Sequence, residues 1–335
     1  MSSARMLGWP VMRALIFVLF FAVSAQAAKN LEIFFIDTEG GQATLVVSPS
    51  GQAMLIDTGY AGYGGRDANR IAEAAKLTHV KRINVLFITH YHKDHAGGVK
   101  NLFEVLPVES VWDHGPGVAD DKSIEGEYLR AAGKTPRTAY KPGDKVPIKD
   151  LDVTVVVAAN KHVETAGDPN PYCAGLKPKT GESGENPQSG GLIVEFGRFR
   201  FGDLGDILWN EELALLCPQN RVGKLDLLLT PHHGTHVSPI ADYALAPRVV
   251  VMNNGPTKGG SAEAYQMWRG MKGLEDLWQL HFALAGEKEG NSPDPFIANI
   301  DEKCEGKYLR VTAHEDGSFT LYNSRNKYTK NYAAK

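Results

Sequence analysis

The sequence predicts a protein of the mixed α and β class (α/β or α+β). Three observations support this fold class. Short apolar runs recur along the chain, segments with a helical pattern separate some of them, and clusters of Gly, Pro and Asn mark turns between elements. With 335 residues, 43% of them hydrophobic, the chain can build a sizeable core.

The first part of the chain predicts four strands and one helix. Residues 31–37, 43–48 and 53–58 form successive apolar runs, and the turn sequences TEGGQ and PSGQ separate them. Residues 66–77 have the pattern of a helix. Residues 83–89 form a continuous apolar run, which is typical of a strand that is buried on both faces.

The second part predicts further strands at 153–159, 191–196, 225–230 and 249–254, followed by a helix at about 261–272. A C-terminal hairpin is expected at about 307–324, with its turn at Asp316-Gly317. Residues 160–190 are rich in Pro, Gly, Asn and Lys, so we expect a long surface loop or an insertion there. The simplest division is one catalytic domain, residues 28–335.

Residues 1–27 have the pattern of a cleavable signal peptide. Arg5 and Arg13 precede a ten-residue apolar core, and small residues at Ala25 and Ala27 offer a cleavage site. Ten apolar residues are too few for a membrane anchor, which needs roughly 20. We therefore expect a periplasmic or secreted protein with no membrane anchor after cleavage.

The charge of the chain disfavours nucleic acid as a partner. Cleavage after Ala27 would remove two arginines and change the formal net charge from −3 to −5. Phosphate contacts need clustered Lys and Arg, and the sequence has no clear basic patch of that kind. A small molecule, or an ester or phosphodiester, is the expected partner.

The mature chain would keep three cysteines: Cys173, Cys217 and Cys304. In an oxidising compartment two of them could pair, but their spacing does not show which. Buried or exposed thiols are an equally good interpretation.

The most informative stretch is FITHYHKDHAGG, residues 87–98. It places His90, His92, Asp94 and His95 within six residues, directly after an apolar strand. Residues i and i+2 of an extended chain point the same way, so His90 and His92 can grip one ion, while Asp94 and His95 can reach a second point. Imidazole and carboxylate are ligands that zinc prefers, which makes metal binding the favoured interpretation over a surface cluster or buried structural histidines.

Other candidate ligands also follow apolar strands. FRFGDLGD offers Asp203 and Asp206, and LLLTPHHGTH offers His232, His233 and His236. Each stretch alone is a weak signal, since a turn aspartate or a polar loop would have the same composition.

Together these motifs resemble the metallo-β-lactamase superfamily. THYHKDHAGG is similar to its H-x-H-x-D-H signature, and MLIDTG before it and FGDLGD and TPHHGT after it stand in the expected order, over about residues 31–255. The opening FFIDTEGGQATLVVSPSGQAMLIDTG and the double histidine before Gly most resemble the extracellular hydrolase domain of competence DNA-uptake proteins. The resemblance implies an αββα sandwich, in which two mixed β-sheets pack face to face between helices.

The resemblance also implies two divalent metal ions, zinc first and manganese or iron as alternatives. His90 and His92 would hold the first ion, and Asp94, His95 and His232 the second, with Asp203 bridging both. Asp94 and His233 would take part in catalysis, His233 by donating a proton or hydrogen bonds. Asp57 would not bind an ion itself but would orient a ligand side chain or the turn that carries it.

One feature departs from the family pattern. Most members have a further histidine before the strand that precedes the bridging acid, and this chain has GENPQSGGLIV there. Asn186 or Ser189 is nearest to that place, and His114 aligns poorly with it. The first ion would then have fewer ligands.

The implied activity is hydrolysis by a hydroxide that bridges two metal ions, with a phosphodiester or ester as the favoured substrate. β-Lactam or lactone hydrolysis is the alternative. A module that keeps the metal-binding scaffold without catalysis is the alternative of another class, because the missing histidine would allow it. The sequence has no G-x-S-x-G motif, P-loop or dinucleotide-binding glycine motif that would indicate other enzyme classes.

Overall fold

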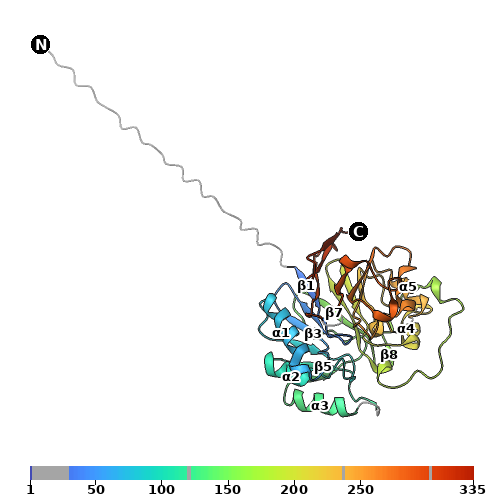
Figure 1. The fold of residues 1–335 in the computed structure, drawn as a ribbon, viewed down its shortest axis with the longest axis horizontal. Helices are drawn as coiled ribbons and strands as arrows, with labels where there is room; N and C mark the ends of the chain where they lie inside the picture. The colour runs from blue at the N-terminus through green and yellow to red at the C-terminus, as the bar shows by residue number, and fades with distance from the viewer. Residues whose placement is uncertain (2–29, 119–121, 236–237, 302–303) are drawn as a thin grey trace.

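A computed structural model describes residues 1, 30–118, 122–235, 238–301 and 304–335. Apart from Met1, the predicted signal peptide lies outside these described residues. Two large mixed β-sheets lie face to face and helices cover their outer sides (Figure 1). The αββα sandwich that the resemblance implied is therefore confirmed.

The first sheet combines the N-terminal strands with the C-terminal ones. Its order is β19-β18-β17-β1-β2-β3-β4-β5-β6, with antiparallel pairs from β19 to β3 and parallel pairs from β3 to β6. Its strands are β1 (Leu31–Phe35), β2 (Thr44–Val47), β3 (Ala53–Ile56), β4 (Val85–Phe87), β5 (Val111–Asp113), β6 (Arg137–Ala139), β17 (Leu309–Ala313), β18 (Phe319–Asn323) and β19 (Thr329–Tyr332).

The second sheet has the order β16-β15-β14-β13-β11-β10-β7-β8 and is parallel from β11 to β16. Its strands are β7 (Asp152–Ala158), β8 (Lys161–His162), β10 (Gly191–Phe196), β11 (Phe199–Asp203), β13 (Leu227–Leu229), β14 (Val249–Met252), β15 (Asp276–His281) and β16 (Ile297–Asn299). A separate short pair joins β9 (Asp168–Pro169) to β12 (Gln219–Asn220).

Three apolar layers hold the sandwich together. Side chains of alternating residues on β1 show the arrangement, because Ile33 packs between the sheets whereas Phe34 packs under the helices of the first sheet. The helices over the first sheet are α1 (Arg66–Leu77), α2 (Val99–Val105) and α3 (Lys122–Ala132). Those over the second sheet are α4 (Trp209–Leu216) and α5 (Ala262–Arg269).

The long segment after β7 is mostly loop, as its composition predicted, and a disulfide fastens it. Cys173 pairs with Cys217 at the end of α4, with their Cα atoms 5.8 Å apart. Cys304 keeps its thiol and is half-buried. Within the described residues, no helix combines the length and apolar character that crossing a bilayer requires.

The topology brings the polar motifs to one edge. The carboxyl ends of parallel strands meet at the same edge of a sheet, so the loops after β11, β13 and β14 open at one edge of the second sheet. The loop after β4 of the first sheet meets them there, because its Asp94 and His95 lie beside Asp206 and His233. Those loops carry the His90–His95 motif, the FGDLGD aspartates, the double histidine and the Gly-rich segment 253–260.

Candidate metal centre

Four buried side chains converge at this edge. Each of Asp94, His95, Asp206 and His233 offers one ligand atom, and these atoms all lie within 4.8 Å of one another. The Nε2 atoms of His95 and His233 are 3.0 Å apart. Both nitrogens face the Oδ2 atoms of Asp94 and Asp206 at 3.2 to 3.3 Å.

Backbone contacts fix the His90–His95 motif against the first sheet. The amide of Gln42 donates to the carbonyl of Asp94 at 3.0 Å, and the amide of Thr58 donates to the carbonyl of His95 at 2.8 Å. Gly98 is required here, because an added Cβ would lie 2.2 Å from the carbonyl oxygen of Thr58. The ligand turn therefore sits directly on the loops that follow β1 and β3.

Asp57 holds the imidazole of His95 from behind, which is the kind of role that the sequence suggested. Its Oδ2 lies 2.7 Å from His95 Nδ1, while its two oxygens accept hydrogen bonds from the amide and hydroxyl of Thr89. A carboxylate on Nδ1 leaves Nε2 to face the cluster, as is usual for metal-binding histidines.

His90 and His92 lie beside the cluster. His90 Nε2 is 3.0 Å from His92 Nδ1 and 3.9 Å from Asp206 Oδ2. Burial, and next the nearby imidazole of His95, lower the pKa of His90 well below its ordinary value. His90 is therefore a neutral imidazole at the rim of the four-residue cluster.

The structure brings Asp206, and not Asp203, into the cluster. The carboxylate of Asp203 instead accepts hydrogen bonds from Gln42 Nε2 at 2.8 Å and from the amide of Gly205 at 3.1 Å. Burial raises the pKa of Asp203 to about 7. The turn after β11 places the side chain three residues later at the centre, which the sequence expectation of Asp203 as the bridge did not foresee.

The double histidine is also arranged differently from the expectation. His233 is fully buried and faces both cluster carboxylates, whereas the side chain of His232 is 19% exposed and its Nε2 lies 3.9 Å from Asp206 Oδ2. Both residues have positive φ, 49° and 54°, which is uncommon outside glycine and turns the second ring inward. The amide of His232 donates to the carbonyl of Gly205 at 3.0 Å and ties this loop to the Asp206 turn.

The three residues considered for the vacant histidine position lie outside the cluster. Asn186 Nδ2 is 3.2 Å from His232 Nε2, and the Ser189 hydroxyl accepts a hydrogen bond from the amide of Asp206 at 3.3 Å. His114 pairs with Glu185 at 2.8 Å. No motif in the sequence pointed to Glu185, whose carboxylate also accepts a hydrogen bond from the amide of Tyr91 and so supports the histidine motif.

Charges within the cluster are mutually stabilised. Burial would raise the pKa of Asp206, but the imidazoles of His233 and His95 hold it well below its ordinary value. Burial would lower the pKa of His95, but the carboxylates of Asp206, Asp94 and Asp57 raise it well above its ordinary value. The imidazole protons therefore balance the carboxylates, and a metal ion that binds here would displace those protons.

The donor set fits a divalent metal ion. Two carboxylate oxygens and two imidazole nitrogens around one point are ligands that zinc takes in proteins. His233 Nδ1 is buried without a hydrogen-bond partner in the structure.

One cation already touches the cluster. The ammonium of Lys258 contacts Asp94 Oδ2 and lies 5.9 Å from the centre of the Tyr60 ring. Lys258 belongs to the loop after β14, and no motif in the sequence marks it as a site residue.

A second cluster of side chains resembles a set of metal ligands, but the guanidinium of Arg70 already balances its negative charge. Asp37, His281 and Cys304 offer ligand atoms within 4.8 Å of one another. The guanidinium of Arg70 is 2.9 Å from Asp37 Oδ2 and 3.6 Å from the sulfur. We assign no ion to this group.

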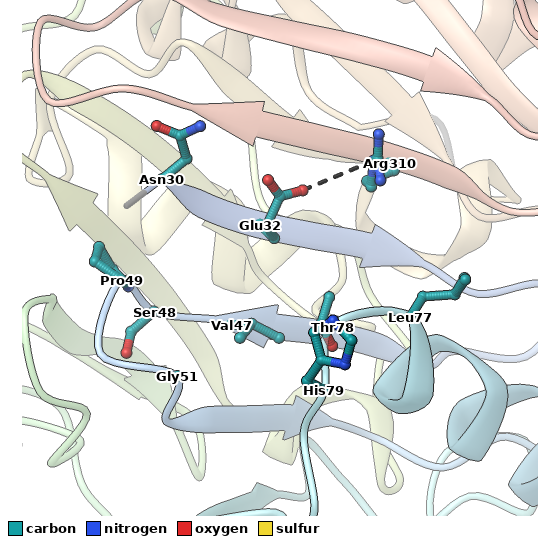
Figure 2. A pocket seen from close by; sticks show the side chains of 10 residues that line it. All are labelled: Asn30, Glu32, Val47, Ser48, Pro49, Gly51, Leu77, Thr78, His79 and Arg310. Carbon is teal, nitrogen blue, oxygen red and sulfur yellow. Dashed lines mark ion pairs between the residues drawn. The ribbon is translucent and has the colours of Figure 1, made fainter. Parts of the chain in front are cut away.

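A surface groove of about 580 Å³ lies elsewhere, where β1, β2 and β17 meet the end of α1 (Figure 2). Glu32 on β1 and Arg310 on β17 form an ion pair of 3.7 Å across it. None of the cluster residues lines this groove. Its lining consists of Asn30, Glu32, Val47, Ser48, Pro49, Gly51, Leu77, Thr78, His79 and Arg310.

Several curated proteins with similar sequences are named thioesterases, and others are named lactamase-like proteins. An atrochrysone carboxyl ACP thioesterase of Aspergillus fumigatus is 26% identical over 107 residues, which cover 31% of this chain and 33% of that protein. The thioesterase pkgB of Emericella nidulans is 32% identical over 107 residues, 32% of this chain and 30% of that protein. The matches thus span about a third of these relatives' length, and they lend no support to the narrower resemblance to competence proteins.

Two solved structures show limited likeness. Zinc-bound PqqB from Methylobacterium extorquens is 13% identical with a TM-score of 0.46, covering 76% of this chain and 98% of that one. The metallo-beta-lactamase fold protein YhfI from Bacillus subtilis is 12% identical with a TM-score of 0.42, covering 84% and 99%. These likenesses carry no information on activity. Among known families, residues 36–183, which contain the His90–His95 motif, match the Metallo-beta-lactamase superfamily.

Proposed function

We propose that this chain is a metal-dependent hydrolase of the metallo-β-lactamase type, acting on an ester or thioester carbonyl. The observation that carries the proposal is the convergence of four ligand atoms, from Asp94, His95, Asp206 and His233, at one buried point. Three separate loops supply them. Burying charged side chains together destabilises the folded state, and a bound cation would offset that cost.

The assignment of roles follows the geometry. We assign to Asp206 the ligand role that was expected of Asp203, and to His233 the ligand role that was expected of His232. A divalent ion held there would lower the pKa of a bound water and polarise a substrate oxygen. Asp57 would keep the ring of His95 aligned, and His232 would face the substrate because its side chain is part-exposed beside Asp206.

An acyl substrate is favoured because several of the relatives reported above are named thioesterases. Those relatives match about a third of the chain, so the inference concerns the reaction class and not the natural substrate. Phosphodiester, β-lactam and lactone substrates are the competing classes within the same chemistry.

We also propose that the chain is exported and that residues 1–27 are removed, on the basis of the apolar core between the arginines and the small residues. The mass of the mature protein purified from its native host tests cleavage after Ala27. An intact N-terminus in the cell interior would contradict it. The Cys173–Cys217 disulfide is consistent with an oxidising compartment.

The activity is tested with one substrate panel, measured with zinc, with manganese and after chelation. The panel contains p-nitrophenyl acetate, an acyl thioester, bis(p-nitrophenyl) phosphate, nitrocefin and a homoserine lactone. We expect ester or thioester turnover that chelator abolishes and metal restores. Asp206→Asn serves as the matched inactive variant.

Two outcomes would contradict the proposal. Turnover that is insensitive to chelation would exclude the metal mechanism. Stoichiometric metal binding without turnover of any substrate in the panel would favour the non-catalytic binding module that the sequence left open.

A further inference from the structure

A pocket of about 580 Å³ lies beside α5, where this helix, the loop after β15 and the residues around β16 meet. We call it the α5 pocket. None of the four residues of the metal cluster lines it, so it is separate from the metal centre. Its volume lies in the range of pockets that bind small molecules.

Apolar side chains supply much of the lining. Ile297 on β16 is buried, Phe282 directly after β15 is half-buried, and Ile300 just after β16 is 43% exposed. An isoleucine that is exposed to this extent beside a pocket leaves apolar surface in contact with water. The apolar part of a ligand would remove that surface from water, which favours binding.

Tyr265 on α5 places an unsatisfied polar group in the same lining. The residue is only 7% exposed, and its hydroxyl makes no hydrogen bond with any residue that the structure describes. Tyrosine hydroxyls that are buried usually find a hydrogen-bond partner. A ligand in the α5 pocket can supply that partner.

Two cations accompany the hydroxyl. Arg269 follows Tyr265 by four residues on α5, so the two side chains lie on the same face of the helix. Lys288 comes from the loop after β15. Within the described part of the chain neither cation forms an ion pair.

The acidic residue of the lining does not balance these cations. Asp294 pairs with Arg325, whose guanidinium lies 3.1 Å from its carboxylate. The α5 pocket therefore combines an apolar surface with an excess of positive charge. That combination is complementary to an anion that carries an apolar tail.

We propose that the α5 pocket binds a carboxylate with an apolar tail, such as a medium-chain fatty acid. Arg269 and Lys288 hold the carboxylate, and the hydroxyl of Tyr265 donates a hydrogen bond to it. Charge-assisted hydrogen bonds of this kind are stronger than neutral ones, and a planar guanidinium matches a planar carboxylate. The tail lies against the apolar lining. This inference goes beyond the proposed function and does not depend on it.

Calorimetric titration with octanoate tests the pocket. The disulfide-bonded protein is titrated in the presence of chelator, so that octanoate does not bind through a metal ion. Octan-1-ol offers the same tail without the charge, and octylammonium offers it with the opposite charge.

The variants separate the head group from the tail. Arg269→Gln and Lys288→Gln each remove one cation, Tyr265→Phe removes only the hydroxyl, and Ile300→Asn removes apolar surface. Arg130→Gln is the matched control, because Arg130 is an exposed arginine in the last turn of α3, as Arg269 is in the last turn of α5. Circular dichroism establishes that each variant is folded.

We expect one octanoate per chain, and binding of octan-1-ol and octylammonium that is at least about tenfold weaker, because the charge-assisted hydrogen bonds are absent. Arg269→Gln and Lys288→Gln should each weaken octanoate binding about fivefold or more and leave octan-1-ol unaffected. Tyr265→Phe should weaken octanoate about threefold, and Ile300→Asn should weaken both octanoate and octan-1-ol.

Three results would each overturn the inference. They are no binding of octanoate to the parent protein, equal affinity for octanoate and octan-1-ol, and the same loss of affinity in Arg130→Gln as in Arg269→Gln. Metal content and hydrolysis do not enter the titration. Failure here would therefore leave the proposed function standing, and an inactive protein that binds octanoate would leave this inference standing.

Discussion

A buried acid pair away from the metal centre should make stability depend on pH. Glu212 on α4 and Asp242 are 1% and 0% exposed, and Ser238 donates a hydrogen bond to Glu212 Oε1 at 3.0 Å. Burial raises the pKa of Asp242 to about 7. Burial, and next the charge of Asp242, raise the pKa of Glu212 well above its ordinary value.

The direction and size of this pH dependence follow from the linkage between proton binding and folding. The unfolded chain loses the Asp242 proton near pH 3.9, whereas the folded chain holds it to about pH 7. The stabilising effect of this proton is therefore complete below the unfolded pKa and is lost as pH rises through the folded one. Between pH 5 and pH 8 the free energy of unfolding should fall by about 3 kcal/mol through Asp242.

Urea unfolding at pH 5, 6, 7 and 8 measures this dependence, with chelator in every sample so that metal binding does not contribute. Asp242→Asn keeps the shape of the side chain and cannot ionise. Between pH 5 and pH 8 the free energy of unfolding of this variant should therefore fall by less than that of the parent protein, and the difference should be about the amount predicted for Asp242. The difference between the two proteins also cancels the contribution of Asp203, whose pKa is raised in the same direction. Parallel pH profiles for the parent and Asp242→Asn would refute the reasoning.

Three further predictions concern the metal centre and the disulfide. Asp206→Ala should lose bound zinc and activity, whereas Asp203→Ala should keep bound zinc; elemental analysis showing the reverse would restore Asp203 as the ligand. Asp57→Asn should weaken zinc affinity about 10- to 100-fold by loosening the ring of His95, measured by chelator competition, and an unchanged affinity would contradict that role. Reducing Cys173–Cys217, which are 44 residues apart, should lower the free energy of unfolding by about 4 kcal/mol in the loop-entropy account, and a loss below about 1 kcal/mol would count against it.

Elements with a strong apolar pattern were predictable from the sequence. The helix predicted at 66–77 is α1 with the same bounds, and the strand predicted at 191–196 is β10 with the same bounds. Predicted strands such as 225–230 were too long, because β13 covers only Leu227–Leu229 and its flanking residues turn into loops. The short helix α2 and the exposed strand β6 have little periodicity, so tertiary contacts and not local pattern decide them.

The composition of the site was predictable, but the choice between neighbouring residues was not. Spacing and position after strands indicated the His90–His95 motif, the two aspartates after β11 and the double histidine. Whether Asp203 or Asp206 reaches the centre depends on the turn at Gly205, which has a φ of 58°. Whether His232 or His233 does so depends on positive φ values that no side-chain pattern predicts for histidine.

Lys258 shows why such choices matter for the chemistry. A lysine in a loop rich in glycine and asparagine has the composition of an ordinary turn, and only the fold of segment 253–260 back onto His233 brings it to Asp94. The same backbone contact that positions a ligand histidine therefore delivers a fixed positive charge to the neighbouring carboxylate. Because this hydrogen bond joins the loop of the ligand histidine to the loop of the lysine, a shift of segment 253–260 would change metal affinity and substrate-side charge together. Substitutions at Gly260, where φ is +65° and an added Cβ would lie 2.8 Å from Ala283 Cβ, should accordingly alter both properties.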